Sequence, residues 1–124
     1  SFLGEINDLP SEVNRGSVAT PFGPIAAPGL SDGAKVRVLI RPEALKLTEL
    51  NGQALAEGIC RGRVVAARFL GRTSLLHLDV TGAGGMDAHM HARASGSFLP
   101  QEGTPVEVSV DRRQIFIFAS PNPI

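Results

Sequence analysis

The chain has no tryptophan and no tyrosine, and Cys60 is the one cysteine among its 124 residues. A lone thiol cannot form an internal disulfide, so the sequence does not require an oxidising compartment. Long hydrophobic runs are also missing, since none approaches the roughly 20 apolar residues of a membrane helix. The first residues lack the basic segment and apolar core of a signal peptide. We therefore expect a soluble, intracellular protein.

An excess of charge is absent too, because 12 Lys and Arg balance 12 Asp and Glu. Binding to nucleic acid or to an anionic membrane needs a basic surplus that displaces counterions. One local basic cluster keeps a single-stranded nucleic-acid module open as an alternative: Arg61, Arg63, Arg68 and Arg72. Such modules add aromatic stacking platforms to their positive charge. Because Ile115–Phe118 is apolar on both faces, we expect Phe116 and Phe118 in the core; the alternative is that one face meets a second copy of the chain. The arginines are then better explained as solvated charges at the rim of a β-barrel, the fold argued below. We predict no nucleic-acid partner.

Glycine and proline are abundant instead, and the 14 glycines and nine prolines interrupt short apolar runs. This pattern favours strands and turns over long helices. We predict a surface loop over 21–33, in which only 25–27 can pair, and a connector over 48–57 whose residues 53–57 could form a helical turn. Strands are predicted at 11–15, 17–20, 36–40, 59–70, 73–80, 88–94, 106–110 and 115–118. The later strands are spaced like those of a β-barrel, so the predicted fold class is all-β.

The stretch from Val36 to Leu47 is the organising element of the sequence. An apolar, β-rich run meets Arg41-Pro42-Glu43 and then continues in alternation. Proline has no amide hydrogen, so it suits the end or the edge of a strand. In an extended chain, Arg41 and Glu43 share one face. We predict that both are at least partly buried and fix this junction; the alternative is a strand that ends in a solvated ion pair.

No arrangement of residues predicts catalysis. Gly82–Gly85 is rich in glycine, but no Lys followed by Ser or Thr comes after it, and no helical pattern begins there. A phosphate-binding loop needs both, because main-chain amides and a helix N-terminus hold the anion. We therefore predict that this chain is not an enzyme and does not hydrolyse ATP by itself. We assign no catalytic residue and no cofactor-binding residue.

Three histidines, His77, His89 and His91, form the strongest candidate for a metal site. His89 and His91 would point to one face of a strand, and an antiparallel neighbour could bring His77 close to them. Two or three imidazoles could hold zinc or copper. The sequence places no carboxylate or cysteine clearly enough to complete the site, and exposed histidines on a hairpin are the alternative. From the sequence we assign no metal.

Three short motifs, in this order along the chain, resemble one family. Phe2-Leu3-Gly4-Glu5-Ile6-Asn7 resembles the exit from a nucleotide-binding domain, Thr20-Pro21-Phe22-Gly23 resembles a turn of the ferric-iron branch, and Leu39-Ile40-Arg41-Pro42-Glu43 resembles a regulatory-domain element. The family is that of the ATP-binding subunits of bacterial ABC importers of the ferric-iron, spermidine and maltose type. This chain resembles their C-terminal regulatory domain, the TOBE module, and the ferric-iron branch in particular.

The resemblance implies an OB-like β-barrel of short antiparallel strands in a single C-terminal accessory domain over 1–124. We expect an entry segment at 1–35, the Arg-Pro-Glu stretch at 36–50 and the TOBE barrel at 58–119. An upstream nucleotide-binding domain, absent from this chain, would bind ATP and magnesium. Implied partners are a second copy of the subunit, its own nucleotide-binding domain and the membrane subunits of the transporter. The implied location is cytoplasmic, peripheral to the inner membrane. A TOBE domain that senses a small oxyanion is the main alternative.

Overall fold

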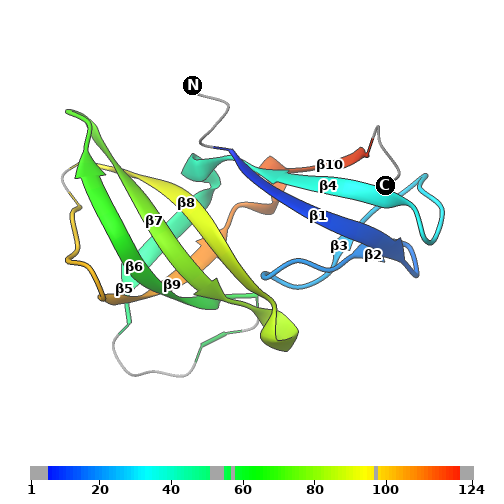
Figure 1. Ribbon diagram of the computed structural model, residues 1–124, viewed down its shortest axis with the longest axis horizontal. Helices are drawn as coiled ribbons and strands as arrows, with labels where there is room; N and C mark the ends of the chain where they lie inside the picture. The colour runs from blue at the N-terminus through cyan, green and yellow to red at the C-terminus, as the bar shows by residue number, and fades with distance from the viewer. Residues whose placement is uncertain (1–5, 51–54, 57, 97, 121–124) are drawn as a thin grey trace.

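The computed structural model describes residues 6–50, 55–56, 58–96 and 98–120. Within them, ten strands form two antiparallel sheets, each of five strands (Figure 1). The first sheet has the order β10-β4-β1-β2-β3, with β1 (Asn7–Asn14), β2 (Ser17–Val18), β3 (Ile25–Ala26), β4 (Lys35–Ile40) and β10 (Ile115–Ala119). The second has the order β5-β9-β6-β7-β8, with β5 (Leu45–Glu49), β6 (Cys60–Phe69), β7 (Thr73–Thr81), β8 (Asp87–Ser95) and β9 (Pro105–Val110). The prediction of an all-β fold of short antiparallel strands is confirmed.

The chain crosses between the two sheets at two short 3-10 turns. Turn η2 (Pro42–Ala44) leads from β4 into β5, and turn η4 (Arg112–Gln114) leads from β9 back into β10. The two crossings are hydrogen-bonded to each other, because the amide of Asp111 donates to the carbonyl of Ala44 at 2.9 Å. Each sheet therefore combines strands from separate parts of the chain. β5 comes from the Arg-Pro-Glu stretch but joins the second sheet, whereas β10 returns to the first.

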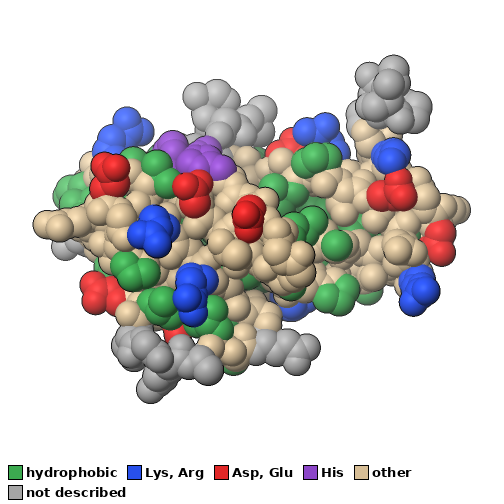
Figure 2. Space-filling view, turned by 60° about the horizontal axis from the view of Figure 1, so that its bottom comes forward, with side chains coloured by type: hydrophobic (Ala, Val, Ile, Leu, Met, Phe, Trp, Pro, Cys, Tyr) green, Lys and Arg blue, Asp and Glu red, His purple; other side chains and the backbone are tan. Residues whose placement is uncertain are grey.

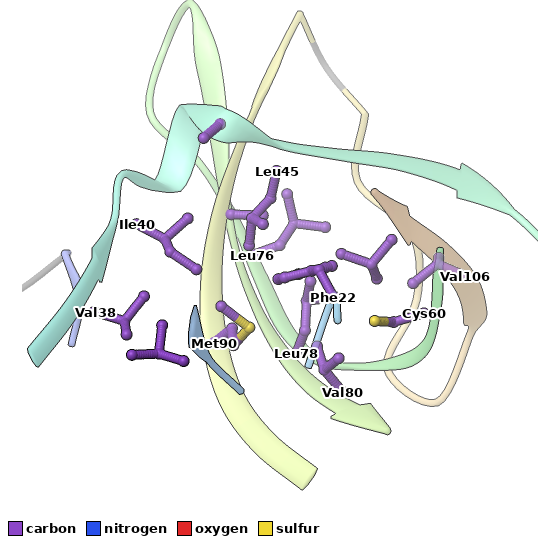
Figure 3. Close-up of a cluster of buried hydrophobic side chains, with 14 of the residues drawn as sticks. Phe22, Val38, Ile40, Leu45, Cys60, Leu76, Leu78, Val80, Met90 and Val106 are labelled. Carbon is purple, nitrogen blue, oxygen red and sulfur yellow. The ribbon is translucent and has the colours of Figure 1, made fainter. Parts of the chain in front are cut away.

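The core is one cluster of apolar side chains to which both sheets contribute (Figure 3). On β7, Leu76, Leu78 and Val80 share the buried face, as their alternation in the sequence predicts. Phe22 is fully buried, although residues 21–33 were predicted to form a surface loop. That prediction is wrong for the start of the segment, because Phe22 fills the space among core side chains that lie far away in the sequence.

The turn Thr20–Gly23 explains how a loop residue reaches the core. The hydroxyl of Thr20 accepts a hydrogen bond from the amide of Phe22 at 3.0 Å and donates to the carbonyl of Gly23 at 2.7 Å. Gly23 has a φ of 100°, a conformation that residues with a side chain rarely adopt. The motif that resembles the ferric-iron branch is therefore a hydrogen-bonded turn that holds an aromatic ring inside the fold.

Strand β6 changes its buried face along its length. Before a bulge between Val64 and Ala66, the residues Cys60, Gly62 and Val64 are buried. After it, Ala67 packs against the core. A bulge inserts one extra residue and so shifts the alternation by one position. This is why neither face of 59–70 is uniformly polar in the sequence.

Strand β10 differs from its prediction. Ile115 and Ile117 pack against the core, but Phe116 and Phe118 are 39% and 53% exposed. Antiparallel sheets commonly have one face on the core and one face in water, and β10 lies at the edge of its sheet beside β4. The expectation that both faces are buried was wrong, because four consecutive apolar residues do not reveal whether a second layer covers the sheet.

The remaining predictions fall on less regular parts of the chain. The tip Gly82–Gly85 is a turn between β7 and β8 that contains η3 (Ala83–Gly85). The predicted helical turn at 53–57 lies mostly outside the described residues. No helix among the described residues is long and apolar enough to cross a membrane.

Candidate functional site

Asn7 joins the two sheets through its side chain. Its amide nitrogen donates to the carbonyl of Ile40 on β4 at 3.1 Å and to the carbonyl of His91 on β8 at 2.9 Å. Its side-chain oxygen accepts from the amide of His91 at 2.6 Å. Asn7 is only 5% exposed, so these bonds replace lost contacts with water. The asparagine of the first motif therefore has a structural role. The motif residues before Ile6 lie outside the described part of the chain.

The Arg41-Pro42-Glu43 motif is arranged differently from its prediction. Arg41 is extended, but the chain turns immediately after it, because Pro42 occupies the first position of η2, where its missing amide hydrogen costs nothing. Pro42 and Ala44 are buried, whereas Arg41 and Glu43 are exposed. The prediction that the two charged side chains are partly buried was wrong. The motif fixes the junction through its apolar members, and the guanidinium of Arg41 lies 5.7 Å from the ring centre of Phe116.

The histidine cluster is assembled as the strand pattern suggests. His77 on β7 is the register partner of His91 on β8, and Asp79 is the partner of His89. The ring centres of His77 and His91 are 4.3 Å apart, and His89 lies 5.6 Å and 5.7 Å from them. One ring nitrogen of each histidine can be chosen so that all three lie within 4.8 Å of one another. Figure 2 shows the histidine side chains as a single patch on the surface.

The register explains this proximity. Both main-chain groups of His91 point away from β7 and bond to Asn7, so His77 and His91 form a non-hydrogen-bonded pair. In such pairs the α-carbons are about 4.5 Å apart and the side chains are closer than in hydrogen-bonded pairs. The Asn7 contact between the sheets thus lies at the edge of β8, beside the histidines.

Asp79 is the member of this cluster that sequence reasoning missed. The Nδ1 atom of His89 and a carboxylate oxygen of Asp79 are 3.1 Å apart. A carboxylate can only accept, so this contact places the proton on Nδ1 and leaves Nε2 free as an acceptor or ligand. A signal was present, because Asp79 stands two residues after His77 and thus on the same face of the strand.

The charge state of the cluster depends on its surroundings. Burial lowers the pKa of His77 below its ordinary value, and the neighbouring His91, His89 and Arg68 lower it further. Lowering the pKa favours the neutral imidazole near neutral pH, the form that can bind a metal ion. His77 can therefore offer a neutral nitrogen donor within the cluster.

The arginines that kept a nucleic-acid module open are all exposed: Arg61, Arg63, Arg68 and Arg72. Arg61 and Arg63 stand opposite Glu107 of β9 and Asp79 of β7 in the sheet register, respectively. Acidic neighbours offset part of the positive charge of the strand. Nucleic-acid binding therefore gains no support from their placement.

Comparison with known proteins places the chain in a family. The family model described as "TOBE domain" matches residues 38–118, the part of the chain from β4 to β10. The chain belongs to the TOBE domain family. The resemblance noted in the sequence is thereby confirmed, and the two curled sheets are the OB-like fold that it implied.

Curated relatives point to one kind of transport protein. The chain is 31% identical over 107 residues to "Fe(3+) ions import ATP-binding protein FbpC" of Pseudomonas fluorescens, which covers 86% of this chain and 30% of that protein. It is 29% identical over 84 residues to the protein of the same name in Yersinia pseudotuberculosis, which covers 68% of this chain and 24% of that protein. The chain thus spans less than a third of the length of these relatives.

A solved structure supports the fold of this TOBE domain. The molybdate-bound crystal structure of the cytoplasmic molybdate-binding protein ModG has a TM-score of 0.64 and 12% sequence identity. The match covers 92% of this chain and 96% of that one. At this identity the likeness extends to the arrangement of strands.

Proposed function

We propose that this TOBE domain is the regulatory and dimerisation domain of the ATP-binding subunit of a bacterial ABC importer for ferric iron or a related substrate. The observation that carries the proposal is the 31% identity with an Fe(3+) import ATP-binding protein over 86% of this chain. ATP and magnesium would then bind to a nucleotide-binding domain outside this chain. The membrane subunits of the importer are the proposed partners of the complete subunit, which would work at the cytoplasmic face of the inner membrane.

The exposed side of β10 supports a role in dimerisation. Phe116 and Phe118 project from the edge strand of the first sheet, and the edge of β10 opposite β4 has no strand partner among the described residues. An apolar edge strand that remains open is a site for pairing with another chain. In a homodimer the same patch serves both subunits, which suits a short strand with two outward-facing rings.

Two measurements test this proposal. The coding sequence immediately upstream should encode a phosphate-binding loop and the magnesium site of an ABC ATPase. Sedimentation of the 124-residue chain should show association that increases with concentration and is weakened by Phe118→Asp. Asp87→Asn, an exposed change on the second sheet, is the control and should leave association unchanged.

Other outcomes would overturn the proposal. An upstream sequence without nucleotide-binding motifs would separate this chain from importer ATPases. Purely monomeric behaviour at high concentration would remove the dimerisation role. Saturable binding of molybdate by the chain would instead favour the oxyanion-sensing alternative.

A further inference from the structure

We propose that His77, His89 and His91 form a binding site for one divalent transition-metal ion of the zinc, nickel and copper class. The inference is independent of the importer role, since it rests on the outward face of β7 and β8. The chain contains three histidines, and the fold brings all of them to this one face. Their ring nitrogens are already within 4.8 Å of one another.

The three nitrogens can converge on one ion with small movements. A tetrahedral zinc ion with Zn–N bonds of about 2.0–2.1 Å holds its nitrogen ligands about 3.3 Å apart. The separations in this structure exceed that value by at most about 1.5 Å, a distance that rotation about the side-chain torsions of imidazoles at the surface can close. His89 is exposed, and His77 and His91 are half-buried, so the cluster combines room to adjust with a fixed backbone.

Asp79 completes the arrangement by holding the ring of His89. A histidine that binds a metal through one nitrogen usually donates its other N–H to a carboxylate, which fixes the ring and increases its basicity. The contact of 3.1 Å between Asp79 and the Nδ1 atom of His89 has this form. With three protein ligands, the fourth position of a tetrahedral ion would remain open to water or a small ligand.

The donor set also determines which ion fits. Imidazole nitrogens suit zinc, copper and nickel, whereas magnesium and calcium prefer oxygen ligands. Imidazole ligands carry no negative charge, so Asp79 would balance the charge of the ion. Two positive side chains stand nearby, because Arg63 is opposite Asp79 in the register and Arg68 lies near His77. Hard ions that need several carboxylates would therefore bind poorly here.

The position of the site gives metal binding a structural consequence. The ion would cross-link β7 to β8 at His91, the residue whose main chain is held by Asn7. Asn7 in turn bonds to Ile40 of the first sheet. Metal binding would therefore stiffen β8 at the point where the two sheets are joined.

Calorimetry on the untagged chain tests the site, with zinc and then nickel as the probe. We expect one ion per chain and no binding of magnesium. His77→Gln, His89→Gln and His91→Gln should each weaken zinc binding by at least about 100-fold, and Asp79→Asn should weaken it by about tenfold. Asp87→Asn is the matched control. Asp87 lines the same groove as Asp79 and His89, but it pairs with Thr81, further along the two strands. It should leave zinc affinity unchanged.

Nuclear magnetic resonance adds a readout at single residues. Every imidazole signal of this chain comes from the cluster, and zinc should shift all three together with the side-chain amide of Asn7. Thermal unfolding without zinc shows whether each variant is folded before its affinity is compared. Absence of saturable zinc binding, or zinc binding that persists in the three histidine variants, would overturn the proposal.

Discussion

Gly82 lies so close to Pro21 that a β-carbon built on the glycine would come within 2.4 Å of the proline α-carbon. The contact joins the tip between β7 and β8 to the Thr20–Gly23 turn. It is reinforced by a hydrogen bond of 2.9 Å from the amide of Ala83 to the carbonyl of Pro21. The same carbonyl accepts a bond from the thiol of Cys60 at 2.9 Å. Pro21 is therefore a point at which three separate segments of the chain meet.

Gly82→Ala should destabilise the domain by about 1–3 kcal/mol, because the new methyl group meets backbone atoms that cannot rotate away. Urea unfolding measures the loss. Gly84→Asn in the same turn is the control: nothing lies within 4 Å of its added β-carbon, and asparagine tolerates the positive φ of 65° there. Equal stability of Gly82→Ala and the wild type would show that the two segments are not held together as described.

Asn7→Ala should cost about 2–4 kcal/mol of unfolding free energy, because it leaves the amide and carbonyl of His91 without their side-chain partner. Urea unfolding again provides the measurement. Asn14→Ala, at the exposed end of the same strand, should change the free energy by no more than about 0.5 kcal/mol. If both variants lose the same amount, the contact between the sheets contributes little.

Glu43→Ala should cost about 0–1 kcal/mol, because the carboxylate is exposed and any ion pair there is screened by water. Ala44→Leu, one residue later, should cost about 1–3 kcal/mol, because Ala44 is fully buried and leaves no space for a larger side chain. Chemical denaturation of both variants decides whether the apolar or the charged members of the motif hold the junction. A larger loss for Glu43→Ala than for Ala44→Leu would restore the role of the charges.

The sequence predicted features that depend on neighbouring residues. The alternation of Leu76, Leu78 and Val80 identified a buried face. The strands predicted at 11–15 and 17–20 imply a tight hairpin turn between them, and Arg15 and Gly16 have positive φ there. The same logic of alternation placed His89 and His91 together. These patterns repeat within a few residues, so no knowledge of the distant partner is needed.

Features that depend on distant partners were not predictable in this way. Phe22 is buried because core side chains from later strands surround it, and a stretch rich in proline and glycine shows none of this. The shared strand face of His77 and Asp79 was visible in the sequence, but the contact of Asp79 with His89 depends on the register of β7 against β8. The exposure of Phe118 depends on which strand lies at the edge. The crossing of β10 back to β4 likewise joins residues that are far apart in sequence.

Cys60 should be unreactive in the native protein. Its thiol is buried, and burial raises the pKa to about 11 from an ordinary value of 9.0. That shift alone lowers the thiolate fraction about 100-fold at pH 8, and burial also blocks access. A thiol reagent should label the chain rapidly in urea and at least about 100-fold more slowly in buffer. Similar rates in the two conditions would contradict the buried position; because the chain has one cysteine, the signal is unambiguous.

The last prediction concerns acid and the turn into β10. Asp111 caps η4 by accepting a bond from the amide of Arg113 at 3.1 Å, and its carboxylate also accepts from the guanidinium of Arg113 and the side-chain amide of Gln114. These contacts, the Arg113 side chain first, lower the pKa of Asp111 well below its ordinary value of 3.8.

A carboxylate with a lowered native pKa stabilises the fold above its unfolded-state pKa, and this contribution is lost as the pH falls through the native pKa. Asp111→Asn keeps a capping oxygen but removes the charge. The variant should therefore unfold at a lower urea concentration than the wild type at about pH 6, and the two midpoints should approach each other as the pH falls from the ordinary value of 3.8 toward the lowered native pKa. The difference should be small and should shrink in high salt, because the side chain of Arg113 is 90% exposed. A difference that persists unchanged into acid would mean that the loss in Asp111→Asn comes from the shape of the turn, since protonation of the wild-type carboxylate would then have no effect.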